Sequence, residues 1–334
     1  MTTTQLTSTL ELIDLHPAAG DLRDLVRDGL SRRPRQLPAW MLYDAEGSRL
    51  FAEICQQPEY TLTRTEIRLL EDNAEAIAAA VGDGVMLEFG IGNARKVDPL
   101  LRALRPSVFV ALDISSSALT EALRGLASSH PATAMLGICC DHSVLDDLPF
   151  HPLLDQQRRI GFFPGSSLGN FSPDAAVALL KRFRHLLAGG PLLLGLDQPR
   201  DPDQLEAAYD DAAGISAAFA RNLLLRLQRD LQVQLDPDEF AYQARWEARE
   251  QRIAMALVAQ GEQRLQLDDL EVWFGSGEEL ITEYSYKYAP ADFLALAAKA
   301  GWQGRQRWSD AKGHFSVHLL HQSEDEQTAD DSAN

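Results

Sequence analysis

The chain has 334 residues and a formal net charge of −18, from 31 basic and 49 acidic side chains. Hydrophobic residues make up 45% of it and charged residues 24%, which excludes a chain that is disordered throughout. The excess of acid argues against a nucleic-acid partner or an anionic membrane surface, because both attract clustered Lys and Arg. The length suits two ordinary domains, or one large domain with a sizeable insertion.

The cysteines and the N-terminus are those of a cytoplasmic protein. Cys55 stands alone and Cys139 and Cys140 are adjacent, which is neither a disulfide framework nor a zinc-binding pattern. The first residues lack the basic and apolar regions of a signal peptide, and no apolar stretch approaches the roughly 20 residues of a membrane helix. We therefore expect a cytoplasmic protein with no membrane partner and no metal.

The N-terminal part of the chain has helical patterns. Residues 1–20 are polar and Thr-rich, and we expect them to be loosely ordered. Apolar side chains at helical spacing predict a short helix over 22–30, and 40–81 is typical of helices joined by loops. Thr63 or Thr65 would cap the last of these helices.

From Gly84 strands and helices alternate, which predicts a parallel sheet covered on both faces. The fold class is therefore α/β. The predicted strands cover 85–90, 107–115, 133–141, 158–171 and 190–198, and the predicted helices cover 92–104, 116–128 and 173–190.

The C-terminal part changes character twice. Residues 201 to about 245 are rich in Ala and Leu and predict helix. Strand patterns follow over 246–267, 270–288 and 304–320, with a helix over 290–302 among them.

The first chemical signal is Glu88-Phe89-Gly90-Ile91-Gly92, after a strand and before a helix. Glycines there allow a tight turn and a close approach of the backbone to a ligand. A dinucleotide-binding loop would have a third glycine where this chain has Arg95. An acidic residue two positions before the first glycine fits the E/D-x-G-x-G motif of S-adenosylmethionine-dependent methyltransferases better. A purely structural turn is the alternative.

Carboxylates end the next two strands. Asp113 can accept both ribose hydroxyl protons, although it could instead cap the following helix, a task that Ser115 to Ser117 could also perform. Asp141 holds the place that commonly reaches the adenine amino group in methyltransferases, and a turn-capping role is equally consistent with its spacing.

Two further groups are polar. Gly165 and Asn170 belong to a small turn at the carboxyl edge of the sheet, where ligands bind in open α/β folds, although Asn is also a common turn former. Glu283 and Ser285 share one face of a predicted strand and could hold a ring that bears N–H groups, unless the strand is a solvent-facing edge.

Ordered motifs over about 35–321 resemble a known family, the histidine Nα-methyltransferases of ergothioneine biosynthesis, which convert L-histidine into trimethylated hercynine. The motifs are YDAEGSRLFAEI, QPEYTLTRTE, LEFGIGNARK, FFPGSSLGNFSP, EAAYDDAAGISAAFARNLL, RIAMAL and TEYSYKY. The resemblance implies S-adenosyl-L-methionine as cofactor and L-histidine as the small-molecule substrate. We expect a monomer.

The resemblance also implies a Rossmann-like methyltransferase sheet with a second α+β substrate domain. The expected parts are an N-terminal helical segment (1–62) that joins the substrate domain, the cofactor-binding domain (63–200), the substrate domain (201–321) and a disordered acidic tail (322–334).

The resemblance also implies roles for individual residues, according to their positions in the motifs. Tyr43 and Asn170 would be catalytic. Substrate contacts would be Asn170 and Tyr209 with the carboxylate, Tyr43 with the amino group through water, Glu283 and Ser285 with the imidazole, Gly165 through its backbone, and Phe51 and Met255 in the pocket wall. Cofactor contacts would be Tyr60, Glu88 of the glycine motif, Gly90, Lys96, Asp113 and Asp141.

The chain departs from the family in three places. Thr61 and Leu62 follow Tyr60 where Tyr-Pro is usual, Ala220 replaces an Asn, and His142 replaces a commoner Phe. The alternatives are the same fold methylating another amino acid such as tryptophan, a nicotinamide-dependent oxidoreductase, and a binding module without catalysis.

Overall fold

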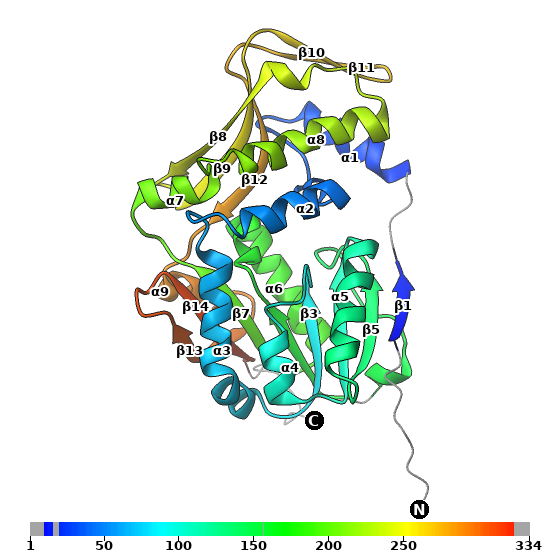
Figure 1. Ribbon diagram of the computed structural model, residues 1–334, viewed down its shortest axis with the longest axis vertical. Helices are drawn as coiled ribbons and strands as arrows, with labels where there is room; N and C mark the ends of the chain where they lie inside the picture. Colours follow the sequence, from blue (N-terminus) through cyan, green and yellow to red (C-terminus); the bar gives the residue numbers. More distant parts are fainter. Residues whose placement is uncertain (1–9, 16–19, 156, 324–334) are drawn as a thin grey trace, which may run out of the picture.

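The computed structural model describes residues 10–15, 20–155 and 157–323, which form two units stacked along the long axis of the molecule (Figure 1). The lower unit contains an eight-stranded sheet. The acidic tail predicted for 322–334 lies outside the described residues from 324 onward, and so do residues 1–9 and 16–19 of the N-terminal segment.

The large sheet is mostly parallel, and only its last two pairings in spatial order, β7 with β14 and β14 with β13, are antiparallel. Its strands, in spatial order, are β1 (Leu10–Asp14), β5 (Ala134–Cys139), β4 (Val108–Asp113), β3 (Val85–Phe89), β6 (Arg159–Phe163), β7 (Leu192–Asp197), β14 (Phe315–Gln322) and β13 (Trp302–Ser309).

Helices cover both faces of this sheet, as the alternating pattern predicts. Met86 and Phe109 pack toward one layer, whereas their neighbours Leu87 and Val110 pack toward the other, because successive side chains of a strand point to opposite faces. The first layer contains α3 (Leu62–Val81), α4 (Asp98–Leu104) and α5 (Ser116–Ser129), and the second contains α6 (Pro173–Leu187) and α9 (Pro290–Ala298).

The strand order creates one natural ligand site. The chain passes from β3 to β4 and β5 on one side and then returns to place β6 on the other side of β3. The loops after β3 and β6 therefore diverge, and a crevice opens at the carboxyl ends of these strands.

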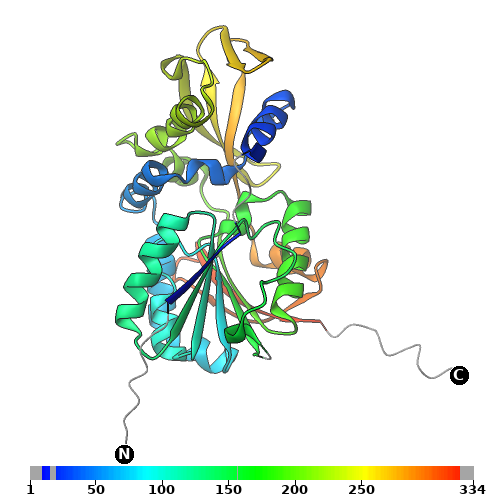
Figure 2. The same cartoon turned by 90° about the vertical axis from the view of Figure 1, so that its right-hand side faces the viewer.

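The second unit lies over this crevice (Figures 1 and 2). Its four-stranded sheet has the order β2 (Arg35–Gln36), β12 (Glu279–Tyr286), β9 (Arg252–Ala259) and β8 (Phe240–Glu247). Around it lie α1 (Gly20–Ser31), the short helix η1 (Ala39–Leu42), α2 (Ala45–Ile54), α7 (Pro202–Tyr209), α8 (Ile215–Leu231) and the hairpin of β10 (Gln263–Leu267) and β11 (Leu270–Phe274).

The division between the units differs from the expected boundaries. Strand β1 joins the edge of the large sheet, although the start of the chain was expected to be loosely ordered and to belong with the substrate domain. Residues 290–322 also belong to the lower unit, because β13 and β14 join the large sheet and α9 packs beside it. The second unit therefore ends at β12. A strand pattern records burial and alternation but not the partner strand, and these partners are distant in sequence.

Two local expectations are wrong. The helix expected to run to about 245 ends at Leu231, and strand β8 begins at Phe240. Helix α3 begins at Leu62, before Thr63 and Thr65, and the N-cap residue is Thr61, which makes no side-chain capping bond. Among the helices of the described residues, none has the length and apolar character needed to span a bilayer.

Candidate functional site

A cavity of about 1740 Å³ lies at the crevice, between the large sheet and the second unit. Its walls come from both units, which brings together motifs more than 200 residues apart in sequence. All but one of the predicted site residues line it: Tyr43, Phe51, Tyr60, Gly90, Lys96, Asp113, Asp141, Gly165, Asn170, Tyr209, Met255, Glu283 and Ser285.

Asp113 lies where β4 ends, and its carboxylate is already oriented by the backbone. Oδ1 accepts a hydrogen bond from Ser115 N (2.9 Å) and Oδ2 accepts one from Gly92 N (3.2 Å). Ser115, and not Asp113, caps helix α5, because its hydroxyl accepts from Ala118 N. A carboxylate has about four acceptor positions, so Asp113 keeps capacity for two ligand hydroxyls.

The loop after β5 places Asp141 and His142 on the same wall. Asp141 Oδ1 accepts from the backbone N and the hydroxyl of Ser143, so this carboxylate does cap a turn while it also faces the cavity. His142 packs against Phe163 and Phe183 in an aromatic cluster, where it takes the place of the commoner Phe. Burial lowers the pKa of His142, so its ring is neutral at pH 7.

Lys96 is held by a buried carboxylate that the sequence did not single out. Glu66, on α3, lies 3.1 Å from Lys96 Nζ, and both of its oxygens accept from Gly165 N at 2.9 Å. Gly165 has a φ of 82°, and a Cβ there would lie 2.7 Å from Lys96 Nζ. The backbone angle therefore favours glycine at this turn, and a side chain there would also displace the Lys96 ammonium.

Glu88 is the exception among the predicted site residues, because the structure does not bring it to the cavity wall. It is fully buried in β3, and neither carboxyl oxygen has a hydrogen-bond partner. Burial raises the pKa of Glu88 well above its ordinary value and so favours the protonated form of this carboxyl. The E-x-G-x-G pattern located the turn correctly, but its glycines and not its acid reach the cavity.

The opposite end of the cavity is formed by β12. This strand lies between β2 and β9, so it is not a solvent-facing edge, and Glu283 and Ser285 are 7% and 4% exposed. Asn170 Nδ2 donates to Glu283 Oε1 at 2.7 Å, and Met255 is the cross-strand partner of Glu283. Asn170 thus touches the residue expected to bind the imidazole.

Close backbone packing keeps this contact in place. Gly169 precedes Asn170 in the short helix η3 (Ser167–Asn170), and a Cβ at Gly169 would lie 2.5 Å from the carbonyl oxygen of Tyr286. Only a residue without a side chain allows η3 to lie so close to β12. This packing joins the large sheet to the second unit beside the predicted substrate residues.

Aromatic rings form the wall between the two ends. Tyr43 packs edge-to-face against Phe51 (5.5 Å between centroids) and Phe219 (5.3 Å), and Tyr60 packs in the same way against Tyr209 (5.8 Å). Electron-rich ring faces of this kind favour a neighbouring cation. Phe219 was not among the predicted contacts, although it lies in a quoted motif one residue before a departure from the family.

Burial shifts the pKa of several groups in the cavity, and two of them bear on the chemistry. It raises the pKa of Tyr43 well above 10, so Tyr43 remains a neutral phenol and is not a base at neutral pH. It also raises the pKa of Glu283 to about 8, although the nearby charge of Lys287 lowers that pKa in part.

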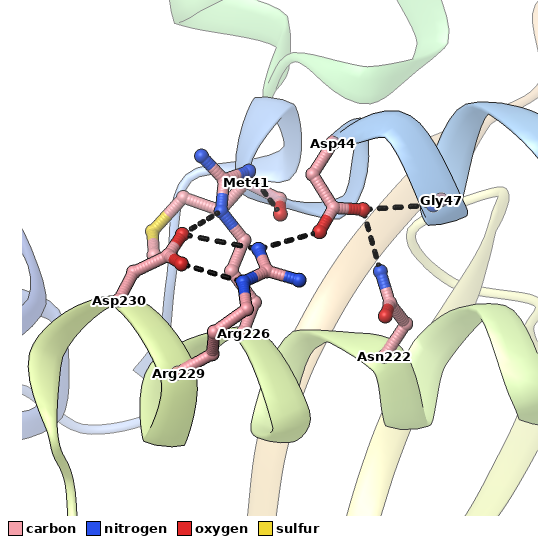
Figure 3. A network of polar contacts seen from close by, with 7 residues as sticks. All are labelled: Met41, Asp44, Gly47, Asn222, Arg226, Arg229 and Asp230. Carbon is pink, nitrogen blue, oxygen red and sulfur yellow. Dashed lines mark hydrogen bonds and ion pairs between the residues drawn. The ribbon is translucent and has the colours of Figure 1, made fainter.

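A polar network fixes the segment that carries Tyr43 (Figure 3). Asp44, the N-cap of α2, accepts from Asn222 Nδ2 at 2.8 Å and forms an ion pair with Arg229 at 2.8 Å, both on α8. Arg226, also on α8, donates to the carbonyl oxygen of Met41 at 2.7 Å. The N-terminal helices are therefore attached to α8 on both sides of Tyr43.

Lys287 is the main polar residue near the site that sequence reasoning missed. Its ammonium donates to Tyr209 Oη (2.6 Å) and Ser285 Oγ (2.9 Å), and these two hydroxyls lie 2.9 Å apart. A signal was present, because Lys287 continues the i, i+2 series of Glu283 and Ser285, which share one face.

The open sheet, the cavity at its switch point and the carboxylates at successive strand ends are typical of Rossmann-like domains that bind an adenosine-containing ligand. The particular family follows from comparison. The chain belongs to the histidine-specific, S-adenosylmethionine-dependent methyltransferases, whose family model matches residues 22–322.

Three relatives illustrate the range of similarity. A histidine N-alpha-methyltransferase from Mycolicibacterium smegmatis is 37% identical over 90% of this chain and 95% of its own length. Ergothioneine biosynthesis protein 1 from Neurospora crassa is 29% identical over 96% of this chain, which corresponds to 37% of that larger protein. A 4-dimethylallyltryptophan N-methyltransferase from Epichloe festucae var. lolii is 27% identical over 86% of this chain and 91% of its own length.

Replacing Glu283 with Gln should make stability less sensitive to pH between about 4.5 and 8. The folded protein holds a proton on Glu283 up to about pH 8, whereas the unfolded chain releases it near pH 4.5, so wild type loses stability as the pH rises between these values. E283Q has no such proton, and its stability relative to wild type should rise across this window by up to about 1.4 kcal/mol per pH unit. Urea denaturation at several pH values measures this difference in stability, and E262Q, at an exposed glutamate, is the control. Parallel curves for wild type and E283Q would contradict the assignment.

Replacing Asp44 with Ala should loosen the segment that carries Tyr43. The variant loses a helix cap and two partners on α8, so we expect the free energy of unfolding to fall by roughly 1–3 kcal/mol. Urea denaturation measures the change. Glu46→Ala, which removes an exposed ion pair on the same helix, is the matched control and should cost no more than about 0.5 kcal/mol. Equal losses in the two variants would show that the network in Figure 3 does not stabilise this segment.

Proposed function

We propose that this protein transfers methyl groups from S-adenosylmethionine to the α-amino nitrogen of L-histidine and forms the trimethylated product, as a step of ergothioneine biosynthesis. The observation that carries the proposal is Glu283, a buried carboxyl on the cavity wall beside Ser285 and bonded to Asn170. A site that presents a carboxyl and a hydroxyl together suits an imidazole, whose two nitrogens both need polar partners. The family and the names of the relatives support the same substrate.

The cavity fits the cofactor on its sheet side. Gly90 and Gly92 have positive φ angles and face the cavity, and space is open beside Gly92 for a close-lying ligand. Asp113 would hold the ribose and Asp141 the adenine, while Lys96 and Tyr60 would hold the amino-acid end. When bound, the cofactor supplies an electrophilic methyl group on a positively charged sulfur.

The residues of the second unit would hold the substrate. Asn170 and Tyr209 would bind the carboxylate, Glu283 and Ser285 the imidazole, and Tyr43 the amino group through water. Gly165 would contribute its backbone, and Phe51 and Met255 would complete the wall.

Positioning is the main task that this chain must perform. The substrate amine must lose a proton and present its lone pair in line with the methyl group, and a fixed geometry provides much of the rate. Tyr43 stays protonated, so it would orient water and pass a proton on, without ionising. Clamping the carboxylate and the ring while the amine remains free to turn would allow three successive transfers at one nitrogen.

The alternative functions fit the site less well. An indole ring would favour a more apolar wall than Glu283 provides, even though a relative acts on a tryptophan derivative. A nicotinamide-dependent oxidoreductase activity is not consistent with membership of a methyltransferase family. We also propose that the protein works as a cytoplasmic monomer, because one chain supplies every residue of the proposed site.

Incubation with the twenty amino acids tests the proposal directly. Purified protein and S-adenosylmethionine should convert L-histidine into species heavier by one, two and three methyl groups, detected by mass spectrometry. Tryptophan and the other amino acids should remain unchanged. Methylation of a different amino acid, with none of histidine, would refute the proposed substrate.

Replacing Glu283 with Ala should weaken histidine binding more than it slows the reaction. Loss of the hydrogen bond to the ring should raise the KM for histidine by at least about tenfold. Steady-state kinetics measure this effect. Tyr284→Phe changes the opposite face of the same strand and is the matched control, with an unchanged KM expected. If KM and kcat of E283A both stay near wild type, the ring binds elsewhere.

A further inference from the structure

Beneath the predicted substrate residues lies a buried charged cluster that the proposed function does not use. Lys287 Nζ lies 2.8 Å from Asp197 Oδ2, and the two side chains are 0% and 2% exposed. Asp197 Oδ1 also pairs with Arg200 at 2.5 Å. Strand β7 of the large sheet supplies Asp197, whereas Lys287 directly follows β12, so the cluster joins the two units.

The hydrogen bonds of Lys287 leave little freedom to its neighbours. Its ammonium forms an ion pair with Asp197 and donates to Tyr209 and Ser285, and one more proton lies between the two hydroxyls. Of the two hydroxyl protons of Tyr209 and Ser285, one therefore forms the hydrogen bond between these two groups. The other must point away from Lys287, and both hydroxyls line the cavity.

The charges of the cluster do not cancel. Lys287 and Arg200 carry two positive charges and Asp197 carries one negative charge. Burial lowers the pKa of Lys287, but Asp197 more than offsets this and the net shift is upward, so the ammonium stays charged. Glu283, with a pKa of about 8, is mostly protonated at pH 7 and does not supply the missing negative charge.

We propose that Lys287, fixed by Asp197, is a positioning residue that makes the site selective for the substrate α-carboxylate. With Ser285 donating to Tyr209, it turns the Tyr209 hydroxyl proton into the cavity, and it leaves beneath Tyr209 a net positive charge that attracts an anion. An amine with the same ring but no carboxylate would gain nothing from either effect. This inference rests on the proposed function, because it assumes histidine as the substrate.

Lys287→Met, tested with two ligands, separates this role from a structural one. The variant leaves Asp197 paired with Arg200, so no buried carboxylate is left without a cation. Titration calorimetry with S-adenosylhomocysteine present measures the Kd of L-histidine and of histamine, which lacks the carboxylate. K287M should bind histidine at least about tenfold more weakly and histamine within about twofold of wild type. Thermal unfolding and the exposed-lysine variant K299M are the controls.

A double-mutant cycle with Tyr209→Phe tests the route of the effect. If Lys287 acts through the Tyr209 hydroxyl, K287M should weaken histidine binding much less in the Y209F background than in wild type. Equal weakening of histidine and histamine by K287M, or no weakening of either, would overturn the proposal. Wild-type protein that binds and methylates no histidine would instead overturn the proposed function, so the two failures are distinguishable.

Discussion

The site depends on one contact between the two units, where the turn after β6 packs on β12. Gly169 lies against the backbone of Tyr286 with no room for a side chain, and Asn170 then donates to Glu283. Without this approach, the carboxyl ends of the sheet strands would open to solvent. With it, residues that could hold a nucleoside and residues that could hold an amino acid face the same cavity.

Polar groups buried at this junction are held in fixed orientations. Glu66 holds Lys96 and the backbone of Gly165 on the sheet side, and Asp197 holds Lys287 beneath the second unit. Each of these carboxylates is buried with a cation, a costly arrangement that is stable only when its hydrogen bonds are well made. Such groups cannot rearrange easily, which suits a reaction that depends on alignment.

Two kinds of residue form the cavity, and the sequence revealed them unequally. Gly90, Asp113 and Asp141 follow strands at recognisable places, so the alternation of strand and helix was enough to bring them to one edge. Glu66 and Lys287 were not singled out, although Lys287 continues the face of Glu283 and Ser285, because a charged residue on a helix or after a strand is usually solvated. Glu88 shows the converse, since the same motif that located the cavity suggested a contact that its burial in β3 prevents.

The sequence by itself determined the α/β class, most element positions and the family, because these depend on local periodicity and on motifs that persist in order. Tertiary structure alone decided that β1, β13 and β14 complete the large sheet, since strand pairing between distant segments leaves no local signal. It also decided that Lys287, Tyr209 and Ser285 share one set of hydrogen bonds. Burial removes the water that would otherwise satisfy these groups, and their partners then depend on which elements pack together.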